Sequence, residues 1–394
     1  MNETIYMPVG EVCSSISDTY REKKNMVTLI NTSDVLEGRV LNHERVPNSN
    51  LKGQFKKTFQ RDDILYSEIR PQNRRFAYVD FSPIDYIAST KLMVIRAKKD
   101  VVSPKYLYYF LKNSSTVAEL QLLAETRSGT FPQITFSEVA NLTIPVPPLA
   151  VQEVIVQTMQ CLEDKTICNE QINDNLEQQA QAIYHERFET VSPNDLPSDW
   201  RIVTLGEVAT ISNKSFNPLK EPEILLEHYS IPAFDEARFP VFELSTSIKS
   251  NKFIIDASCF MISKLNPTTK RVWKPYCLTR NAVCSTEFIV YKAKDKTITD
   301  FLYSVIDSGS FSDFMCSHVT GSTGSRQRTT PSDTLSYELI LPSEDELAEF
   351  QSLVSPMYAQ MRINAIENDK LKRLRDSLLP KLMSGEIDVS SVHL

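Results

Sequence analysis

An internal repeat with a spacing of 196 residues organises this chain. Three blocks recur in one order and with matching apolar patterns: Val9–Val12 as Leu205–Val208, Leu65–Pro71 as Met261–Pro267, and Ser89–Ile95 as Ser285–Tyr291. The spacing becomes 195 further along, for Gly129 with Gly324 and for Pro147 with Pro342. A solenoid unit is far shorter than this period. The repeat therefore predicts two copies of a whole domain, and hence a protein with two similar binding regions.

The general properties of the chain fit a globular protein with more than one domain. Its 394 residues suffice for two or three domains with separate cores. No apolar run is long enough to cross a bilayer, and Met1 to Gly10 has neither a basic start nor an apolar signal core. Seven cysteines without a C-x-x-C pair do not suit a secreted disulfide framework. These features predict a cytoplasmic location and no membrane partner.

The net charge of −7 conceals two basic windows at equivalent positions in the repeat. Lys52–Lys99 contains 11 basic and 5 acidic side chains, and Ile248–Asp295 contains 9 basic and 3 acidic ones. Each window is a candidate surface for a polyanion such as nucleic acid. A solvated Lys/Arg face is the alternative interpretation. The acidic remainder of the chain argues against strong non-specific DNA affinity of this chain alone.

Each half has the pattern of a mixed domain built from short strands and short helices. Apolar runs rich in β-formers at Lys91–Ala97 and Glu287–Ala293 predict strands. Ser103-Pro104 opens a predicted helix in the first half, and the second half has a counterpart. The expected fold class is α+β, with two similar mixed α/β domains at residues 1–148 and 191–342.

A long helix is predicted after each domain, over residues 149–190 and within residues 343–394. Apolar residues at seven-residue spacing, with one Asn in the middle of each helix, predict a coiled coil whose register the Asn pair sets. Packing of each helix on its own domain is the alternative. The predicted seam consists of Ile155, Leu162, Asn169, Leu176, Ile183, Phe350, Met357, Asn364, Leu371 and Leu378.

The second long helix carries signals at both ends. Ser343 and Glu346 have the spacing of a capping box, which predicts the start of the helix near Ser343. Pro380 with Gly385 is expected to mark its end.

The order and spacing of several motifs resemble the DNA-specificity subunits of type I restriction–modification systems. The resemblance lies in Ile144–Leu149 followed by Gln152, in Leu162–Lys165, in Leu196-Pro197 and Trp200 ahead of Leu205–Glu207, and above all in Leu371–Ile387. The second half departs from the pattern at Leu341–Glu344, which lacks the double proline of the first half and the Gln that follows it.

The resemblance implies a subunit that reads a bipartite DNA target. Each of two target recognition domains reads one half of a split sequence, and the two long helices form an antiparallel coiled coil with pseudo-twofold symmetry. This pair sets the spacer and docks the methyltransferase (M) subunits, which number two. Those partners bring S-adenosylmethionine and methylate adenine, and a motor–nuclease (R) subunit brings ATP and Mg. The recognition chain itself would be non-catalytic and would bind none of these cofactors.

Other functional classes stay open. One is a specificity subunit of a related defence or modification system, and another is a protein-interaction scaffold whose basic surfaces bind acidic proteins. Enzymatic motifs are weak, since neither a P-loop nor a G-x-G-x-x-G motif occurs. Asn266-Pro267-Thr268 lacks the aromatic residue of an adenine methyltransferase loop. Asp62, Asp63 and Glu68 are only a faint nuclease-like set, and no metal site is predicted.

Sequence-specific DNA readout requires side chains that present paired donors and acceptors to base edges, with Lys and Arg contacting phosphates. In the first domain the candidates are Lys52, Gln54, Lys56, Lys57, Arg70, Gln72, Asn73, Arg74, Arg75, Arg127 and Gln133. In the second they are Lys249, Asn251, Lys252, Lys264, Asn266, Lys270, Arg271, Lys274, Arg326, Gln327 and Arg328. We rank Arg74-Arg75 and Lys270-Arg271 first because they follow the repeated proline turns, and Arg326–Arg328 next. The two windows share sign but not sequence, which predicts two different half-sites.

Overall fold

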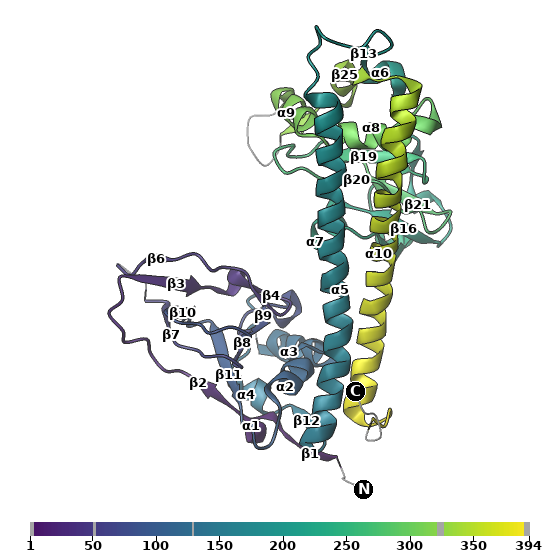
Figure 1. Ribbon diagram of the computed structural model, residues 1–394. Coiled ribbons are helices and arrows are strands. Elements are labelled where there is room, and N and C mark those ends of the chain that lie inside the picture. The colour runs from purple at the N-terminus through teal and green to yellow at the C-terminus, as the bar shows by residue number, and fades with distance from the viewer. Residues whose placement is uncertain (1–3, 50–52, 128–129, 321–326, 390–394) are drawn as a thin grey trace. The chain divides into compact units, whose positions relative to one another are not determined.

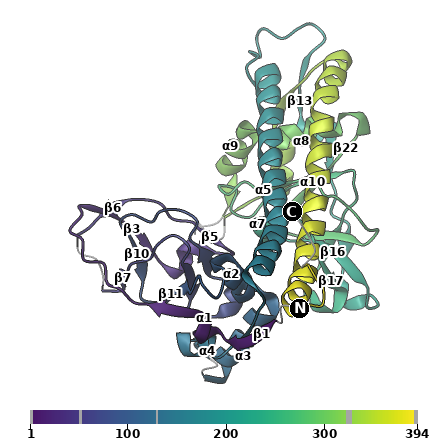
Figure 2. The same cartoon turned by 60° about the horizontal axis from the view of Figure 1, so that its bottom comes forward.

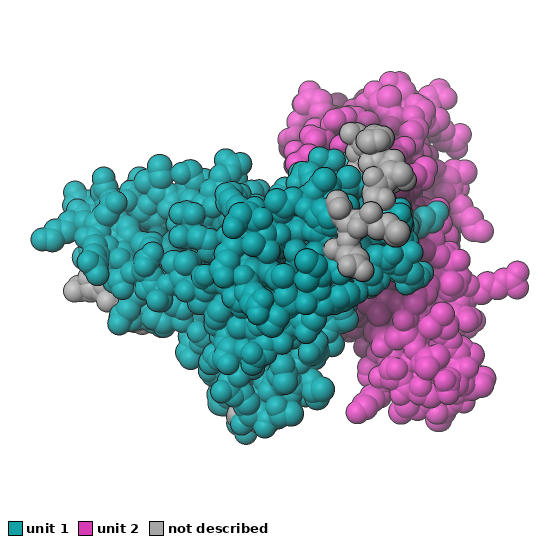
Figure 3. All heavy atoms as spheres, turned by 90° about the horizontal axis from the view of Figure 1, so that it is seen from below, with its two compact units in different colours: residues 1–165, 370–394 teal, residues 166–369 magenta. Residues whose placement is uncertain are grey.

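The computed structural model describes residues 4–49, 53–127, 130–320 and 327–389 (Figure 1). The chain divides into two compact units: residues 1–165 with 370–394 form unit 1, and residues 166–369 form unit 2 (Figure 3). Each unit combines one mixed α/β domain with part of each of two long helices, α5 (Leu149–Tyr184) and α10 (Glu344–Ser384).

The central sheet of unit 1 is antiparallel, in the order β2-β11-β8-β9. Met93 and Ile95 of β11 belong to one hydrophobic core and Leu92 and Val94 to another, because neighbouring residues of a strand point to opposite faces. A sheet covered on both faces explains why this strand is an apolar run without alternation. The four strands span Cys13–Ile16 (β2), Leu92–Ala97 (β11), Ile64–Ser67 (β8) and Phe76–Tyr78 (β9).

Helices pack on one face of this sheet and a second sheet packs on the other. The helices are α2 (Pro104–Lys112), α3 (Ser114–Arg127) and α4 (Phe136–Ala140), labelled in Figure 2. Residues of all three belong to the same core as Met93. The second sheet has the order β6-β3-β10-β7, in which β10 is parallel to β3 and antiparallel to β7. Its strands span Val46–Pro47 (β6), Met26–Ile30 (β3), Tyr86–Ser89 (β10) and Phe55–Lys57 (β7).

The remaining short strands of unit 1 form two small two-stranded sheets. Strand β1 pairs with β12 antiparallel, directly ahead of α5, and β4 pairs with β5 in a small hairpin. These elements span Ile5–Pro8 (β1), Val9–Val12 (α1), Val35–Leu36 (β4), Arg39–Val40 (β5) and Thr143–Val146 (β12), with 3-10 turns at Thr32–Asp34 (η1) and Pro71–Asn73 (η2).

Unit 2 repeats the central sheet in the same register. Cys13 pairs with Ala97 in unit 1, and Ala209 pairs with Ala293 in unit 2, each residue being shifted by 196. The corresponding order is β14-β22-β19-β20. The internal repeat predicted from sequence is thus present at the level of individual backbone pairs. These strands span Ala209–Ile211 (β14), Phe288–Ala293 (β22), Cys259–Ser263 (β19) and Val272–Trp273 (β20).

The outer sheet of unit 2 is larger than its counterpart. It has the order β15-β18-β21-β16-β17 and is accompanied by α7. Its strands span Ser215–Phe216 (β15), Lys252–Ile254 (β18), Ala282–Ser285 (β21), Leu225–Tyr229 (β16) and Val241–Leu244 (β17). The other elements are β13 (Arg201–Thr204), α6 (Leu205–Val208), α7 (Ile231–Ala237), α8 (Thr299–Ile306), α9 (Gly309–Ser317), β23 (Val319–Thr320), β24 (Arg328–Thr329) and β25 (Glu338–Leu341). Strand β13 pairs with β25 as β1 pairs with β12.

The two long helices run antiparallel within unit 2. Asn169 Nδ2 donates to Asn368 Oδ1 (2.8 Å), and four residues further along α5, Asn173 Oδ1 accepts from Asn364 Nδ2 (2.8 Å). The partner number falls on α10 as the number rises on α5, which defines the antiparallel direction. The two predicted Asn residues are both buried, but each pairs with another Asn, so two Asn pairs replace the expected direct pair of Asn169 and Asn364.

The residues of the predicted seam are buried to different degrees. Ile155, Asn169, Phe350 and Asn364 are buried, whereas the other six are half-buried. Of these six, four pack against the two main cores, namely Leu162, Ile183, Met357 and Leu378.

The ends of the long helices differ from the sequence-based expectation at one point. Pro380 lies inside α10, which continues to Ser384, and Gly385 then adopts a left-handed φ of 78°. A proline inside a helix removes one backbone donor, and here the helix tolerates that loss close to its end. At the other end, Ser343 Oγ accepts from the backbone N–H of Glu346 (3.3 Å), as the capping signal predicts.

Candidate nucleic-acid interface

Several predicted basic residues of unit 1 are held by contacts within the unit. Lys57 Nζ donates to the carbonyls of Thr90 (3.1 Å) and Leu92 (2.8 Å), and burial lowers the pKa of its ammonium group. Arg127 pairs with Glu138 (2.7 Å). These cations already use hydrogen-bond donors within the unit, so fewer of their donors are available to a phosphate.

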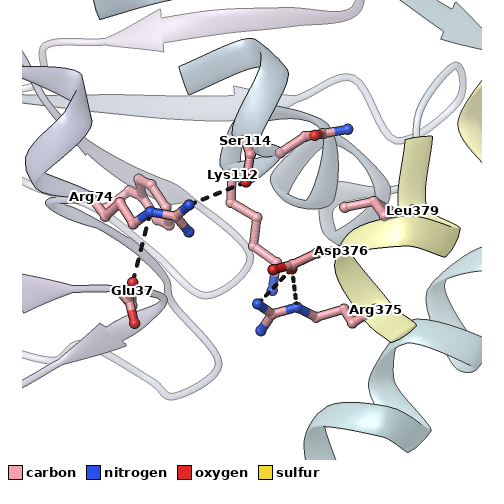
Figure 4. A pocket seen from close by; sticks show the side chains of 9 residues that line it. Glu37, Arg74, Lys112, Ser114, Arg375, Asp376 and Leu379 are labelled. Atoms are coloured by element: carbon pink, nitrogen blue, oxygen red, sulfur yellow. Dashed lines mark hydrogen bonds and ion pairs between the residues drawn. The ribbon is translucent and has the colours of Figure 1, made fainter. Parts of the chain in front are cut away.

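Arg74 and Arg75, the two residues ranked first in this half, also have partners. Arg74 Nη2 donates to Ser114 Oγ (3.1 Å), and its Nε lies 3.8 Å from Glu37. It lines a small surface cavity of about 50 Å³ (Figure 4). Arg75 Nη1 donates to the carbonyl of Ser33 (3.0 Å). Their guanidinium groups therefore tie the turn that follows Pro71 to neighbouring elements.

A second group of predicted residues in unit 1 is exposed. Gln54 directly precedes β7, and Lys56 lies within it. Three further exposed side chains belong to the turn η2 and to Arg70, the residue directly before it. Among the described residues, the side chain of Arg70 makes no hydrogen bond or ion pair. The exposed members of the predicted set in unit 1 are Gln54, Lys56, Arg70, Gln72 and Asn73.

Most predicted basic residues of unit 2 are paired with carboxylates. Arg271 donates two hydrogen bonds to Asp235 (2.6 and 2.9 Å), and Arg328 donates two to Glu287 (2.9 and 3.2 Å). Lys270 and Lys274 pair with acidic residues at the two ends of α8, Asp307 (2.8 Å) and Asp300. The positive window of this half is thus partly neutralised where the structure describes it, since Lys292 also pairs with Asp256 (2.5 Å).

One predicted residue of unit 2 is buried. Lys252 is 5% exposed, its Nζ donates to Ser250 Oγ (2.6 Å), and burial lowers the pKa of its ammonium group. Its neighbours Lys249 and Asn251 are exposed, whereas Lys264, Asn266 and Gln327 are half-buried. Lys52 and Arg326 lie outside the described residues, as do the repeated glycines Gly129 and Gly324.

Two equivalent turns bring predicted residues of each unit together. In unit 1 the backbone N–H of Arg70 donates to the carbonyl of Pro132 (3.1 Å), one residue before Gln133. In unit 2 the backbone N–H of Asn266 donates to the carbonyl of Gln327 (3.0 Å), one residue before Arg328. The structure therefore joins the proline turn and the later loop, which lie far apart in the sequence, into one edge in each unit.

Sequence reasoning missed the charged partners at this edge. Lys91 of unit 1 pairs with Glu68 (3.4 Å) and donates to Gln133 (3.3 Å), and its counterpart Glu287 of unit 2 pairs with Arg328. The signal was present in the sequence, because Glu68 and Lys91 recur 196 residues later as Lys264 and Glu287 with exchanged signs.

The acidic residues considered as a nuclease-like set have cationic partners. Asp63 is buried and accepts two hydrogen bonds from Arg96 (both 2.7 Å), and Asp62 accepts from Tyr78 (2.8 Å) and Lys99 (2.6 Å). Across the described residues, no group of three or more His, Cys, Asp or Glu side chains could hold a metal ion. Within the same described ranges, no helix is long and apolar enough to cross a membrane.

One family model matches the first part of the chain, and two relatives match most of it. Residues 6–178 match the family model described as "Type I restriction modification DNA specificity domain". The specificity subunit of type I restriction enzyme HindI from Haemophilus influenzae is 27% identical, over 92% of this chain and 94% of its own length. The MjaIX specificity subunit from Methanocaldococcus jannaschii is 24% identical, over 79% of this chain and 77% of its own length.

Two solved structures share the fold. The S subunit of a type I restriction–modification system from M. genitalium gives a TM-score of 0.54 at 15% identity, covering 98% of this chain and 97% of that one. A chain from a study of assembly and conformational transition of a type I system gives 0.51 at 18% identity, covering 98% of both chains. These likenesses confirm the predicted fold class, two mixed α/β domains with long central helices.

Proposed function

We propose that this chain, which belongs to the family of DNA-specificity subunits of type I restriction–modification systems, reads a bipartite DNA target and directs partner subunits to it. One observation carries this proposal. The two units have the same backbone register over the central sheet but different side chains at the edge where the proline turn meets the later loop. One scaffold that presents two different polar edges can read two different half-sites.

The chain forms a complex with methyltransferase and motor–nuclease subunits and acts in the cytoplasm, where its DNA target lies. We propose that two methyltransferase subunits bind it, in keeping with the internal repeat. S-adenosylmethionine would be bound by those methyltransferase partners, and ATP and Mg by the motor–nuclease subunit. This chain supplies recognition and no catalytic group.

A map of N6-methyladenine across the genome tests the proposal. Cells expressing this chain with its methyltransferase subunit are compared with cells that express the methyltransferase subunit alone. We expect a split methylated motif that appears only when the chain is present. A methylation pattern independent of the chain would contradict the proposal and favour a protein-interaction scaffold.

Exchange of one domain tests the modular part of the proposal. Residues 1–148 are replaced by the corresponding domain of a related subunit, and methylated sites are mapped again. We expect one half of the motif to change and the other half to stay. A change in both halves would show that the two units do not read DNA independently.

A further inference from the structure

The arginines predicted to contact DNA differ in what their side chains already bind. Arg74, Arg75 and Arg127 of unit 1 have the partners described above, as do Arg271 and Arg328 of unit 2. Arg70 is exposed, and its side chain makes no hydrogen bond or ion pair within the part of the chain that the structure describes. Its five guanidinium donors are therefore available to a ligand.

We propose that Arg70–Asn73, which we call the reading loop, supplies direct base contacts of unit 1, with Arg70 specifying a guanine. This inference rests on the proposed function, because it presupposes that unit 1 binds a DNA half-site. It adds which segment reads bases and which base one residue selects.

The backbone of the reading loop is held rigidly. Arg70 and Arg74, on either side of the turn η2, both adopt left-handed φ angles of 45° and 52°. The backbone N–H of Asn73 donates to the carbonyl of Arg70 (2.8 Å), which closes the turn. A rigid turn lowers the entropic cost of holding a side chain against a base.

The loop is also attached to its surroundings at three points. The backbone N–H of Arg70 donates to Pro132, and that of Gln72 donates to Oε1 of the buried Gln121 on α3 (3.2 Å). Arg74 reaches Ser114 on the same helix (Figure 4). These bonds use backbone groups and the Arg74 side chain, and they leave the exposed side chains of Arg70, Gln72 and Asn73 for a ligand.

The residue types of the loop are those used for direct readout. The forked guanidinium of arginine binds O6 and N7 of guanine, and the amides of Gln and Asn bind N6 and N7 of adenine. Lysines and arginines nearby can contact phosphates and set the register. Lys91 lies close to the loop, because it donates to Gln133, which follows Pro132 directly, and its side chain is 50% exposed although it pairs with Glu68.

The equivalent turn of unit 2 shows that this backbone conformation forms without an arginine. Asn266 has a φ of 49°, and the backbone N–H of Thr269 donates to its carbonyl (2.9 Å). Asn adopts left-handed angles more readily than Arg. An arginine at this position thus carries a backbone cost that no hydrogen bond or ion pair of its side chain, among the described residues, offsets. A base contact would offset it.

The inference is tested on the complex of this chain with its methyltransferase subunits. Arg70→Lys keeps the charge but loses the fork, and Arg70→Asn installs the residue that unit 2 uses in the same left-handed turn. Arg61→Lys is the matched control, because Arg61 is also exposed in the same unit but lies outside the loop. Methylated motifs are mapped for each variant, and binding to the wild-type site is measured against salt concentration.

For both Arg70 variants we expect discrimination at one guanine of the first half-site to fall about 10- to 100-fold, with the second half-site unchanged. The salt dependence of binding should be unchanged for Arg70→Lys, and the control should keep the full motif. An unchanged motif with uniformly weaker binding would overturn the inference and make Arg70 a phosphate contact.

Failure of this inference can be told apart from failure of the proposed function. If the wild-type complex yields no chain-dependent motif, the proposed function fails. If the wild type yields a motif that both Arg70 variants retain, only the reading loop is refuted. Gln72→Ala gives an independent check, because its backbone bond to Gln121 survives the change while an adenine-specific position of the same half-site should relax.

Discussion

Units 1 and 2 share a backbone register but reverse the sign of charge at equivalent places. At the edge of the central sheet, unit 1 pairs Glu68 with Lys91 (3.4 Å). Unit 2 has Lys264 and Glu287 at these positions, and Glu287 pairs with Arg328 (2.9 Å). The carboxylate and the cation have thus exchanged positions at this edge, and the carboxylate of unit 2 takes its cationic partner from β24.

A second reversal occurs at the C-terminal end of the first domain helix. Lys112 ends α2 and pairs with Glu163 of α5. The residue 195 positions later, Asp307, follows α8 and pairs with Lys270 (2.8 Å). The two equivalent charges take their partners from different elements of the fold. Each has a partner because an unpaired buried charge would be strongly destabilising.

The comparison separates what the scaffold requires from what it tolerates. The strand pairs of the central sheet are equivalent in the two units, whereas the signs of the local charges are not. An ion pair needs only two opposite charges in contact, and either position can carry either sign. The two units can therefore diverge in surface chemistry without a change of fold, which is what the proposed reading of two different half-sites requires.

The cores around the long helices differ as well, and this difference predicts the largest effect. In unit 2, Tyr184, Phe188, Phe301 and Phe350 are in mutual ring contact, at centroid distances from 5.2 to 6.3 Å. The equivalent positions of unit 1 are Leu379, Met383, Tyr106 and Ile155, which belong to one largely aliphatic core.

Phe350→Ala should lower the free energy of unfolding of unit 2 by about 4 kcal/mol, because a large buried ring is lost and a cavity remains. Amide hydrogen exchange reports this locally, through faster exchange in α8 and β22. Ile155→Ala is the matched change in unit 1, and we expect about 3 kcal/mol there with faster exchange in α2. Equal loss of protection in both units after either change would show that they unfold together and would break the comparison.

The reversed charge at Asp307 predicts the next largest effect, on pH dependence. Burial raises the pKa of the Asp307 carboxyl group from its usual 3.8 to about 6, although Lys270 opposes the shift. The folded state therefore holds this proton more tightly than the unfolded state. Stability of unit 2 should then decrease as pH rises from about 4 to 6 and stay level above that range.

Asp307→Asn should remove this slope and stabilise unit 2 above pH 6 by about 2 kcal/mol. Urea unfolding between pH 4 and 7, followed in unit 2, provides the measurement. In unit 1 burial lowers the pKa of the equivalent Lys112 below its usual 10.5, so the corresponding slope has the opposite sign and stability rises with pH in a window that ends near 10.5. A variant that is less stable than the wild type at pH 7 would mean that the ion pair with Lys270 outweighs the cost of burial.

Much of the fold was predictable because it depends on patterns that repeat. The offset of 196 and the apolar runs at Lys91–Ala97 and Glu287–Ala293 predicted two similar domains, and these runs are buried central strands. The end of α10 was misjudged, since Pro380 lies inside it. The last turns of a helix that packs on a core, as Leu379 and Leu382 do here, can tolerate a proline that local sequence rules treat as a stop.

The candidate site was harder to predict, because a basic residue has the same sequence signature whether it is free or paired. Arg74 and Arg271 were ranked first, yet both are held by neighbours within their units. Their partners Ser114 and Asp235 are distant in sequence, so only the fold reveals them. Whether a basic side chain is free to bind DNA depends on its neighbours in the folded protein. The composition of a stretch of sequence cannot predict those neighbours.

The smallest predicted effect tests the reversal at the sheet edge directly. The pair of Glu68 and Lys91 is partly exposed, and such pairs contribute at most about 1 kcal/mol. Lys91→Glu should destabilise unit 1 by roughly 0.5–1 kcal/mol because it faces Glu68, and adding Glu68→Lys should recover most of that loss. The double variant carries the signs of Lys264 and Glu287, and urea unfolding compares all forms.

Recovery in the double variant should be incomplete for a reason visible in unit 2. There Glu287 pairs with the charged Arg328. The counterpart of Arg328 in unit 1 is Gln133, which is uncharged and cannot form an ion pair with a carboxylate. Adding Gln133→Arg to the double variant should therefore regain the remaining few tenths of a kcal/mol. If the triple variant is no more stable than the single Lys91→Glu form, the polarity of this edge is set by its wider surroundings, and the two units are less interchangeable than their shared register indicates.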